Sequence, residues 1–178
     1  MNRQILISGF GGQGMMRLGK ILAEIALYQK KHTSWFPSYG AEMRGGTAHC
    51  FVKISNRPIS SPFIDSPDIA VIFNQPSLAK FKNNFSGKTK VILNTDLIKK
   101  EHLSKIGKKI SCPLNKIAFN CGNIKVANIV ALGIISSLDR RLIKKQIVLS
   151  VLRKNFSGKK KLKQNLEAFS KGENYGKG

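Results

Sequence analysis

The sequence has few acidic residues and few of the side chains that perform most enzyme chemistry. Its 178 residues include 9 acids, 3 histidines and 3 cysteines, against 31 lysines and arginines. So few carboxylates leave little room for a catalytic carboxylate pair, and no Ser-His-Asp arrangement or nucleophile elbow is evident. The cysteines, Cys50, Cys112 and Cys121, are odd in number and form no C-x-x-C motif. We therefore predict three buried thiols, with no disulfide and no zinc or iron–sulfur site.

Long apolar runs are also missing, since none approaches the roughly 18–20 residues that a membrane-spanning helix requires. The first predicted strand begins within a few residues of Met1, which argues against a signal peptide. We therefore expect a cytoplasmic protein with no membrane partner. The length and the hydrophobic content of 42% predict one domain with a sizeable core, spanning residues 1–178.

The shortage of acids leaves a net charge of +22. Such a charge is typical of proteins that bind nucleic acids or dock an acidic partner. The lysines are scattered along the chain, however, and only Lys159–Lys161 forms a run of three. The chain is also rich in Lys, Asn and Ile together, the combination that AT-rich codons produce. We favour codon bias, because dispersed charge is more often a solvated surface than a binding surface.

The start of the chain has the pattern of a strand, a glycine-rich turn and a helix. Ile5–Ile7 is a short apolar run, Gly9–Gly14 contains four glycines, and apolar residues then recur at helical spacing over 15–26. The glycines satisfy G-x-G-x-x-G, which alone is a weak sign of dinucleotide binding. The segment is therefore either a phosphate-binding loop or a turn that permits close packing.

Dinucleotide binding would require an acid at the end of the second strand, to hold the ribose. Residues 30–36 contain no carboxylate, which disfavours NAD. Lys30 and Lys31 could face the extra phosphate of NADP, but lysine is so frequent in this chain that their presence says little.

Strands and helices follow one another along the rest of the chain. Further strands are predicted over 32–36, 47–54, 69–73, 90–94 and 116–119. Helices are predicted from a cap at 74–77 to about 83, in a short stretch from Asp96, and over 126–138, 140–156 and 159–169. A frayed polar tail is predicted from Gly172. The pattern indicates an α/β fold, a three-layer Rossmann-like domain with a helical C-terminal third.

One loop, at residues 35–46, combines aromatic rings, a proline, an acid, a base and a glycine pair. Glu42 and Arg44 can order the loop through an ion pair or backbone hydrogen bonds, and Gly45 and Gly46 admit another backbone or a flat ligand. The loop joins two strands, at an edge where α/β sheets place their sites. The alternative is a self-contained structural loop.

Six different short motifs are distributed along the whole chain. They are Gly11–Gly14, Pro37–Gly46, Ile59–Pro62, Asn74–Leu78 with Phe81, Asn128 with Ala131–Gly133, and Asn165 with Ala168, Phe169 and Gly172. In this order they resemble the gamma subunit of 2-oxoacid:ferredoxin oxidoreductases, over nearly the whole chain. The wording of the second motif is most similar to members that act on branched-chain 2-oxoacids or 2-oxoglutarate.

The resemblance implies a complex that oxidatively decarboxylates a 2-oxoacid, transfers the acyl group to coenzyme A and reduces ferredoxin. Thiamine diphosphate, magnesium and the iron–sulfur clusters would belong to other chains, namely alpha and beta subunits and a ferredoxin-like delta subunit. This chain has no G-D-G…N thiamine motif and no cluster cysteines. It would therefore contribute structure and help to enclose coenzyme A, with no catalytic residue and no activity in isolation.

The resemblance also implies where two sets of residues would lie. Gly11, Gly12, Gln13 and Gly14 would lie near a phosphate of coenzyme A or at a subunit interface. The loop facing the alpha and beta subunits would be formed by Tyr39, Gly40, Glu42, Arg44, Gly45 and Gly46.

Two other hypotheses follow from the charge. The first is a free-standing, basic, Rossmann-like protein that binds nucleotides or nucleic acid, and the absence of an aromatic–basic platform counts against it. The second is that part of the +22 charge steers an acidic ferredoxin toward the complex. The dispersed lysines support neither strongly.

Overall fold

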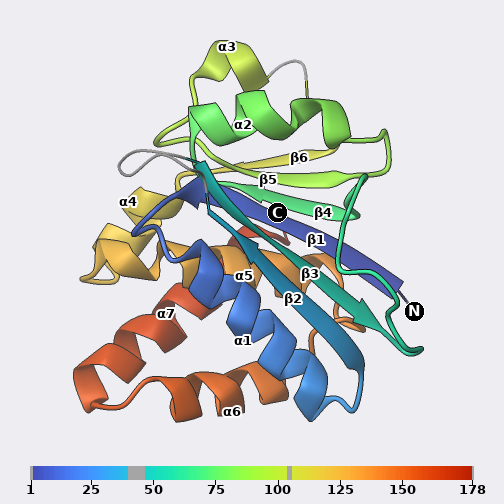
Figure 1. Ribbon diagram of the computed structural model, residues 1–178. Coiled ribbons are helices and arrows are strands. Elements are labelled where there is room, and N and C mark those ends of the chain that lie inside the picture. The colour runs from blue at the N-terminus through green and yellow to red at the C-terminus, as the bar shows by residue number, and fades with distance from the viewer. Residues whose placement is uncertain (1, 40–46, 104–105, 178) are drawn as a thin grey trace.

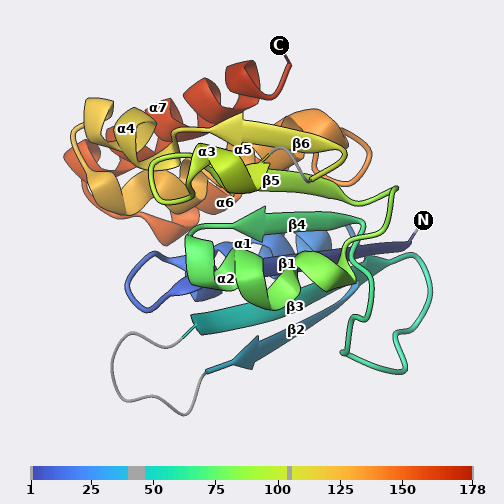
Figure 2. The ribbon, with the colours of Figure 1, turned by 90° about the horizontal axis from the view of Figure 1, so that it is seen from above.

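A six-stranded sheet separates two layers of helices in the computed structural model, which describes residues 2–39, 47–103 and 106–177 (Figures 1 and 2). The strands are β1 (Asn2–Phe10), β2 (His32–Ser38), β3 (Thr47–Ser55), β4 (Ile69–Ile72), β5 (Lys90–Asn94) and β6 (Lys109–Cys112). Their order in the sheet is β2-β3-β1-β4-β5-β6. The predicted α/β class and its three layers are confirmed.

The direction of the strands decides where the site can form. β1, β4, β5 and β6 are parallel, whereas β3 lies antiparallel between β1 and β2. The carboxyl ends of the four parallel strands therefore meet at one edge of the sheet, where α/β proteins place their ligands. We call this the carboxyl edge and the opposite one the amino edge.

The helices divide unequally between the two faces. They are α1 (Met15–Tyr28), α2 (Gln75–Phe81), α3 (Lys100–Leu103), α4 (Leu114–Asn120), α5 (Ala127–Leu138), α6 (Lys145–Asn155) and α7 (Lys159–Tyr175), with 3₁₀ turns at Lys82–Asn84 and Ile124–Val126. Figure 1 shows α2 and α3 on one face and α1 with the C-terminal helices on the other.

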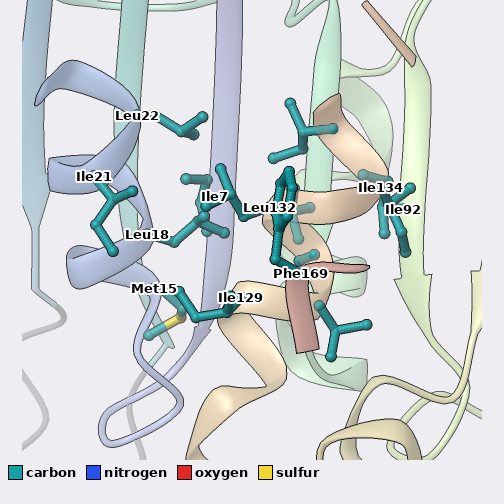
Figure 3. Close-up of a cluster of buried hydrophobic side chains, with 14 of the residues drawn as sticks. Ile7, Met15, Leu18, Ile21, Leu22, Ile92, Ile129, Leu132, Ile134 and Phe169 are labelled. Carbon is teal, nitrogen blue, oxygen red and sulfur yellow. The ribbon is translucent and has the colours of Figure 1, made fainter. Parts of the chain in front are cut away.

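The alternation of side chains along β1 divides the core in two. Ile5 and Ile7 point into the large core beneath α1 and α5, whereas Leu6 points into the smaller core beneath α2. In the large core the chain brings together residues from distant elements, among them Leu18 and Phe169 (Figure 3). Each side chain that is fully buried in this way contributes about 1.5–3 kcal/mol.

Helix α5 is buried from Ala127 to Ser136, as expected of a helix that is apolar on every side. It packs closely on α7, because a Cβ atom on Gly172 would overlap the carbonyl oxygen of Val130, and one on Gly133 that of Phe169. The prediction of a frayed tail from Gly172 is wrong. α7 continues to Tyr175, since its last turns are held against α5 and the Tyr175 hydroxyl donates to the Ser111 carbonyl at 2.7 Å.

Three further predictions of secondary structure are corrected by the structure. Residues 116–119 belong to α4, not to a strand, because Leu114 and Ala118 are buried at helical spacing, and the last strand is β6. Asp96 starts no helix, since α3 begins at Lys100. The helix predicted over 140–156 begins only at Lys145, because Asp139 holds the residues that follow it in a turn.

The contact between α5 and α7 predicts the effect of one added methyl group. Gly172→Ala should lower the free energy of unfolding by about 1–3 kcal/mol, because the methyl overlaps the Val130 carbonyl and forces the helices apart. Gly87→Ala is the matched control, since a Cβ atom there meets nothing within 4 Å. Urea unfolding followed by circular dichroism measures both, and equal midpoints would contradict the close contact.

Candidate functional site

The carboxyl edge gathers polar side chains from three successive parallel strands. The glycine-rich loop follows β1, Asn74 follows β4, and Asn94 ends β5. Asn74 and Asn94 are both buried. Buried amides need partners, and most of those found here are backbone groups of neighbouring loops.

The glycine-rich loop is closed by its own glutamine. The Gln13 Oε1 atom accepts hydrogen bonds from the Phe10 N–H at 2.7 Å and from Asn74 Nδ2 at 3.2 Å. Asn74 in turn caps α2, because its Oδ1 atom accepts from the Ser77 N–H at 3.0 Å. The predicted cap at Asn74 is therefore confirmed, and it is joined directly to the loop.

Two glycines fit this loop tightly. A Cβ atom on Gly9 would lie 2.5 Å from Gln13 Oε1 and 2.6 Å from the Met15 sulfur. Gly14, with a φ of 78°, is the N-cap of α1 in the left-handed conformation, which favours glycine. Its carbonyl accepts from Asn128 Nδ2 at 3.0 Å, so α5 helps to place the beginning of α1.

Backbone donors remain exposed on the loop. Gly11 and Gly12 are exposed, and a Cβ atom on either would meet nothing within 4 Å. α1 has no side-chain cap and no acid in its first turn. The N–H groups at this end of α1 are therefore suited to an anion, as helix N-termini commonly are.

A second group of polar contacts closes the edge beside β5. Asn94 Nδ2 donates to the Phe73 carbonyl at 3.1 Å and to Asn115 Oδ1 at 3.3 Å, and its Oδ1 atom accepts from the Leu114 N–H at 3.1 Å. The Asp96 carboxylate accepts from the N–H groups of Asn115 and Lys116, at 2.8 and 3.0 Å. This contact between the β5 end and α4 was not predicted from the sequence. The only sign in the sequence was an asparagine at the end of an apolar run.

The predicted interface loop lies only partly within the described chain. Tyr39 follows β2 and is exposed, whereas Gly40, Glu42, Arg44, Gly45 and Gly46 lie outside the described residues. The strand ends that flank them are at the carboxyl edge, since Thr47 pairs with Phe10. The flanks of this loop and the glycine-rich loop therefore share one edge.

Lys30 and Lys31 cannot serve the dinucleotide role that was considered for them. They precede β2 and lie at the amino edge, where Lys31 Nζ donates to the Arg141 carbonyl at 3.1 Å. β2 is also separated from β1 by the antiparallel β3, so the usual ribose position beside β1 is occupied by another strand.

The cysteines are buried and free, as predicted. Burial raises the pKa of the Cys50 and Cys112 thiols to about 12, and burial likewise raises the pKa of Cys121. Thiols with such pKa values are poor nucleophiles and poor metal ligands. Within residues 2–39, 47–103 and 106–177, no three His, Cys, Asp or Glu side chains form a group that could hold a metal ion.

His49 lies on the α2 side of β3, with ring contacts to Phe51 at 5.1 Å and Phe81 at 4.9 Å between centroids. Burial, together with the smaller effect of the nearby Lys80 charge, lowers the pKa of His49 to about 4. The ring is therefore neutral near pH 7. None of the helices in the described part of the chain has the length and apolar character needed to cross a membrane.

Residues 4–175 match the protein family described as pyruvate ferredoxin/flavodoxin oxidoreductase. The chain is 40% identical to ketoisovalerate oxidoreductase subunit VorA of Methanothermobacter marburgensis, over 89% of this chain and 33% of VorA. It is 35% identical to 2-oxoglutarate synthase subunit KorC of Methanocaldococcus jannaschii, over 97% of this chain and 92% of KorC. The chain therefore spans about a third of VorA but nearly all of KorC.

Solved structures have the same fold. The gamma subunit of a keto/oxoacid ferredoxin oxidoreductase from Geobacter sulfurreducens superposes with a TM-score of 0.82 at 26% identity, over 99% of this chain and 97% of that one. A 2-oxoglutarate:ferredoxin oxidoreductase from Magnetococcus marinus, with 2-oxoglutarate, coenzyme A and succinyl-CoA bound, gives 0.88 at 25% identity. The match covers 99% of this chain and 31% of that one.

The loop geometry predicts different costs for two glycine substitutions. Gly9→Ala should destabilise the protein by about 1–3 kcal/mol, because the methyl displaces Gln13 from its contacts with Phe10 and Asn74. Gly11→Ala should change stability by less than about 0.5 kcal/mol, since its surroundings are open. Thermal unfolding of both variants measures the difference, and a Gly9→Ala variant as stable as the parent would refute the closed loop.

The environment of His49 predicts how stability depends on pH. Its pKa of about 4 in the folded state is below the ordinary 6.5, so the unfolded chain binds the proton more readily between these values. The stability that this site contributes is complete above pH 6.5 and is lost as the pH falls toward 4. His49→Gln should flatten the decline in unfolding free energy over this window by up to about 2 kcal/mol. Urea unfolding at pH 4 and at pH 7 measures this decline, and an equal decline in the variant and the parent would contradict the effect of the buried ring.

Proposed function

The chain belongs to the pyruvate ferredoxin/flavodoxin oxidoreductase family, and from this we propose that it is the gamma subunit of a multi-subunit 2-oxoacid:ferredoxin oxidoreductase. The observation that carries the proposal is the extent of two matches. Nearly the whole chain matches nearly the whole Geobacter sulfurreducens gamma subunit, and it likewise matches nearly the whole of KorC. The longer VorA matches in one third of its length, which fits a domain that works beside others.

The complex would decarboxylate a 2-oxoacid oxidatively, transfer the acyl group to coenzyme A and reduce ferredoxin. VorA and KorC, by name, concern ketoisovalerate and 2-oxoglutarate, which suggests one of these substrates. Thiamine diphosphate, magnesium and the iron–sulfur clusters would be held by alpha, beta and ferredoxin-like delta subunits. The three free, buried cysteines fit a reducing, cytoplasmic location.

Within the complex, the exposed end of the glycine-rich loop would face a phosphate of coenzyme A. Two observations support this role. Gly11 and Gly12 are exposed before the uncapped start of α1, and the related Magnetococcus marinus enzyme binds coenzyme A. Gln13 would act by positioning, since its side chain is engaged in holding the loop closed. Tyr39, Gly40, Glu42, Arg44, Gly45 and Gly46 would contact the alpha and beta subunits.

Co-expression with alpha, beta and ferredoxin-like delta subunits from the same organism tests the subunit assignment. The tagged chain should recover a complex that reduces ferredoxin with a 2-oxoacid and coenzyme A, whereas the isolated chain should have no activity. A chain that stays monomeric in the presence of all three subunits would overturn the assignment.

Arg44→Ala should weaken assembly, as measured by the complex mass.

A carboxylate on the loop tests the contact with coenzyme A. Gly11→Asp introduces a negative charge into open space, so the chain should fold and assemble normally. The KM for coenzyme A should rise about tenfold with kcat little changed, because the charge repels a phosphate in the ground state and the transition state alike. Gly87→Asp, also in open space, is the control. An unchanged KM in an intact complex would refute the contact while leaving the subunit assignment standing.

A further inference from the structure

We propose that the amino edge of the sheet carries a docking groove for an acidic segment of a partner protein. The groove is a half-open hollow of about 760 Å³. Its lining comes from the starts of β1 and β4, the approach to β5 and the turn after α5, and its basic residues are Arg3, Lys88, Lys90, Arg140 and Arg141. It lies at the end of the sheet where the N-terminus is marked in Figure 1, opposite the glycine-rich loop.

The two acids of the groove are already engaged by the protein itself. Asp139 accepts from Arg3 Nε at 2.8 Å and from the N–H groups of Arg141 and Leu142 at 3.1 and 3.0 Å. Burial alone would raise the pKa of Asp139, but the Arg3 side chain and these N–H groups hold that pKa below its usual range. Asp68 accepts from the Gln4 N–H at 2.8 Å. Both carboxylates therefore serve mainly to fix the backbone of the groove.

Three of the five basic side chains of the groove are not engaged by the described residues of the protein itself. In the described part of the chain, the side chains of Lys88, Arg140 and Arg141 are exposed and have no hydrogen-bond or ion-pair partner. Lys90 makes only a long contact, 3.4 Å, with the Leu138 carbonyl. Cations from two separate segments thus face one hollow whose walls are held in place, and this arrangement favours an anionic ligand.

The shape of this edge indicates an extended ligand. A second hollow of about 590 Å³ is lined by Asn2, Ser55, Asn56, Arg57 and Pro58. Since Asn2 adjoins Arg3, the two hollows follow one another along the amino edge. A compact anion would fill only part of this length, whereas an extended polypeptide segment would follow it.

The chemistry of the lining separates a polypeptide from nucleic acid. No aromatic side chain lines either hollow, so bases would have nothing to stack on. A DNA backbone also carries only acceptors, and its phosphates would lie against the exposed Asp68. An acidic polypeptide brings carboxylates for the arginines and N–H donors for Asp68, so it complements both kinds of group.

The test compares two charge reversals of equal size on the full chain. Lys88→Glu with Arg140→Glu changes the groove, whereas Lys160→Glu with Lys161→Glu changes exposed residues at the start of α7, which both views place at the opposite end from the N-terminus. The probe is a fluorescein-labelled peptide of alternating glutamate and serine, and anisotropy is measured at two salt concentrations. The groove variant should bind about tenfold more weakly and the α7 variant less than about twofold, because like charges repel only where the peptide lies.

Carbodiimide cross-linking of the wild-type chain gives an independent readout, with linkage expected at Lys88 and Lys90. Equal loss in both variants, or linkage spread evenly over the lysines, would overturn the groove in favour of general charge attraction. Tighter binding of duplex DNA that is lost in the groove variant would overturn the choice of ligand. The inference does not depend on the proposed function, because it needs neither coenzyme A nor the assembled complex.

Discussion

The burial of α5 on every side is the constraint on which the rest of the structure depends. A helix without a polar face must be enclosed, and here α7, α4 and α1 contact it and side chains of the sheet complete the large core around it. The approach of α7 is close enough that Gly133 and Gly172 have no room for a side chain. The same helix carries Asn128, whose amide holds the Gly14 carbonyl at the start of α1. Core packing and the position of the glycine-rich loop are therefore set by one element.

Neutral amide side chains hold the loops of the carboxyl edge in place, so backbone N–H groups there are ordered before any anion binds. Gln13, Asn74 and Asn94 satisfy one another or the local backbone, and the Asp96 carboxylate beside β5 is bound by two backbone N–H groups. An anion that arrives there meets backbone N–H groups on a loop that is already ordered, with no carboxylate in the first turn of α1 to repel it. Because the loop is ordered beforehand, an anion that bound there would cost less conformational freedom.

The elements with a long hydrophobic pattern could be predicted from the sequence. The predictions failed for elements whose type or end depends on tertiary contacts. β1, its glycine turn and α1 were predicted well because each has a clear pattern. Residues 116–119 were misjudged because four apolar-rich residues fit a strand or a helix equally, and only the burial of Leu114 and Ala118 separates them. The last turns of α7 are polar, and the contact of Gly172 with Val130 is invisible in one dimension. Lys30 and Lys31 lie at the amino edge because they precede β2, which runs in the same direction as β1, and the insertion of the antiparallel β3 between these two strands is not evident from the local sequence.

The positions of the basic residues in the folded chain affect the interpretation of the net charge of +22. Along the sequence the lysines and arginines look evenly dispersed, a pattern that favours codon bias as the explanation of their number. Number and placement are separate questions, however, because folding can gather dispersed residues. Arg3, Lys88 and Arg140 are far apart in the chain and line the same hollow, while both nearby acids are bound to the protein's own backbone or to Arg3. Basic residues that are dispersed in the sequence can thus form a directed surface at one edge of the folded chain, while the other edge presents buried amides and backbone N–H groups.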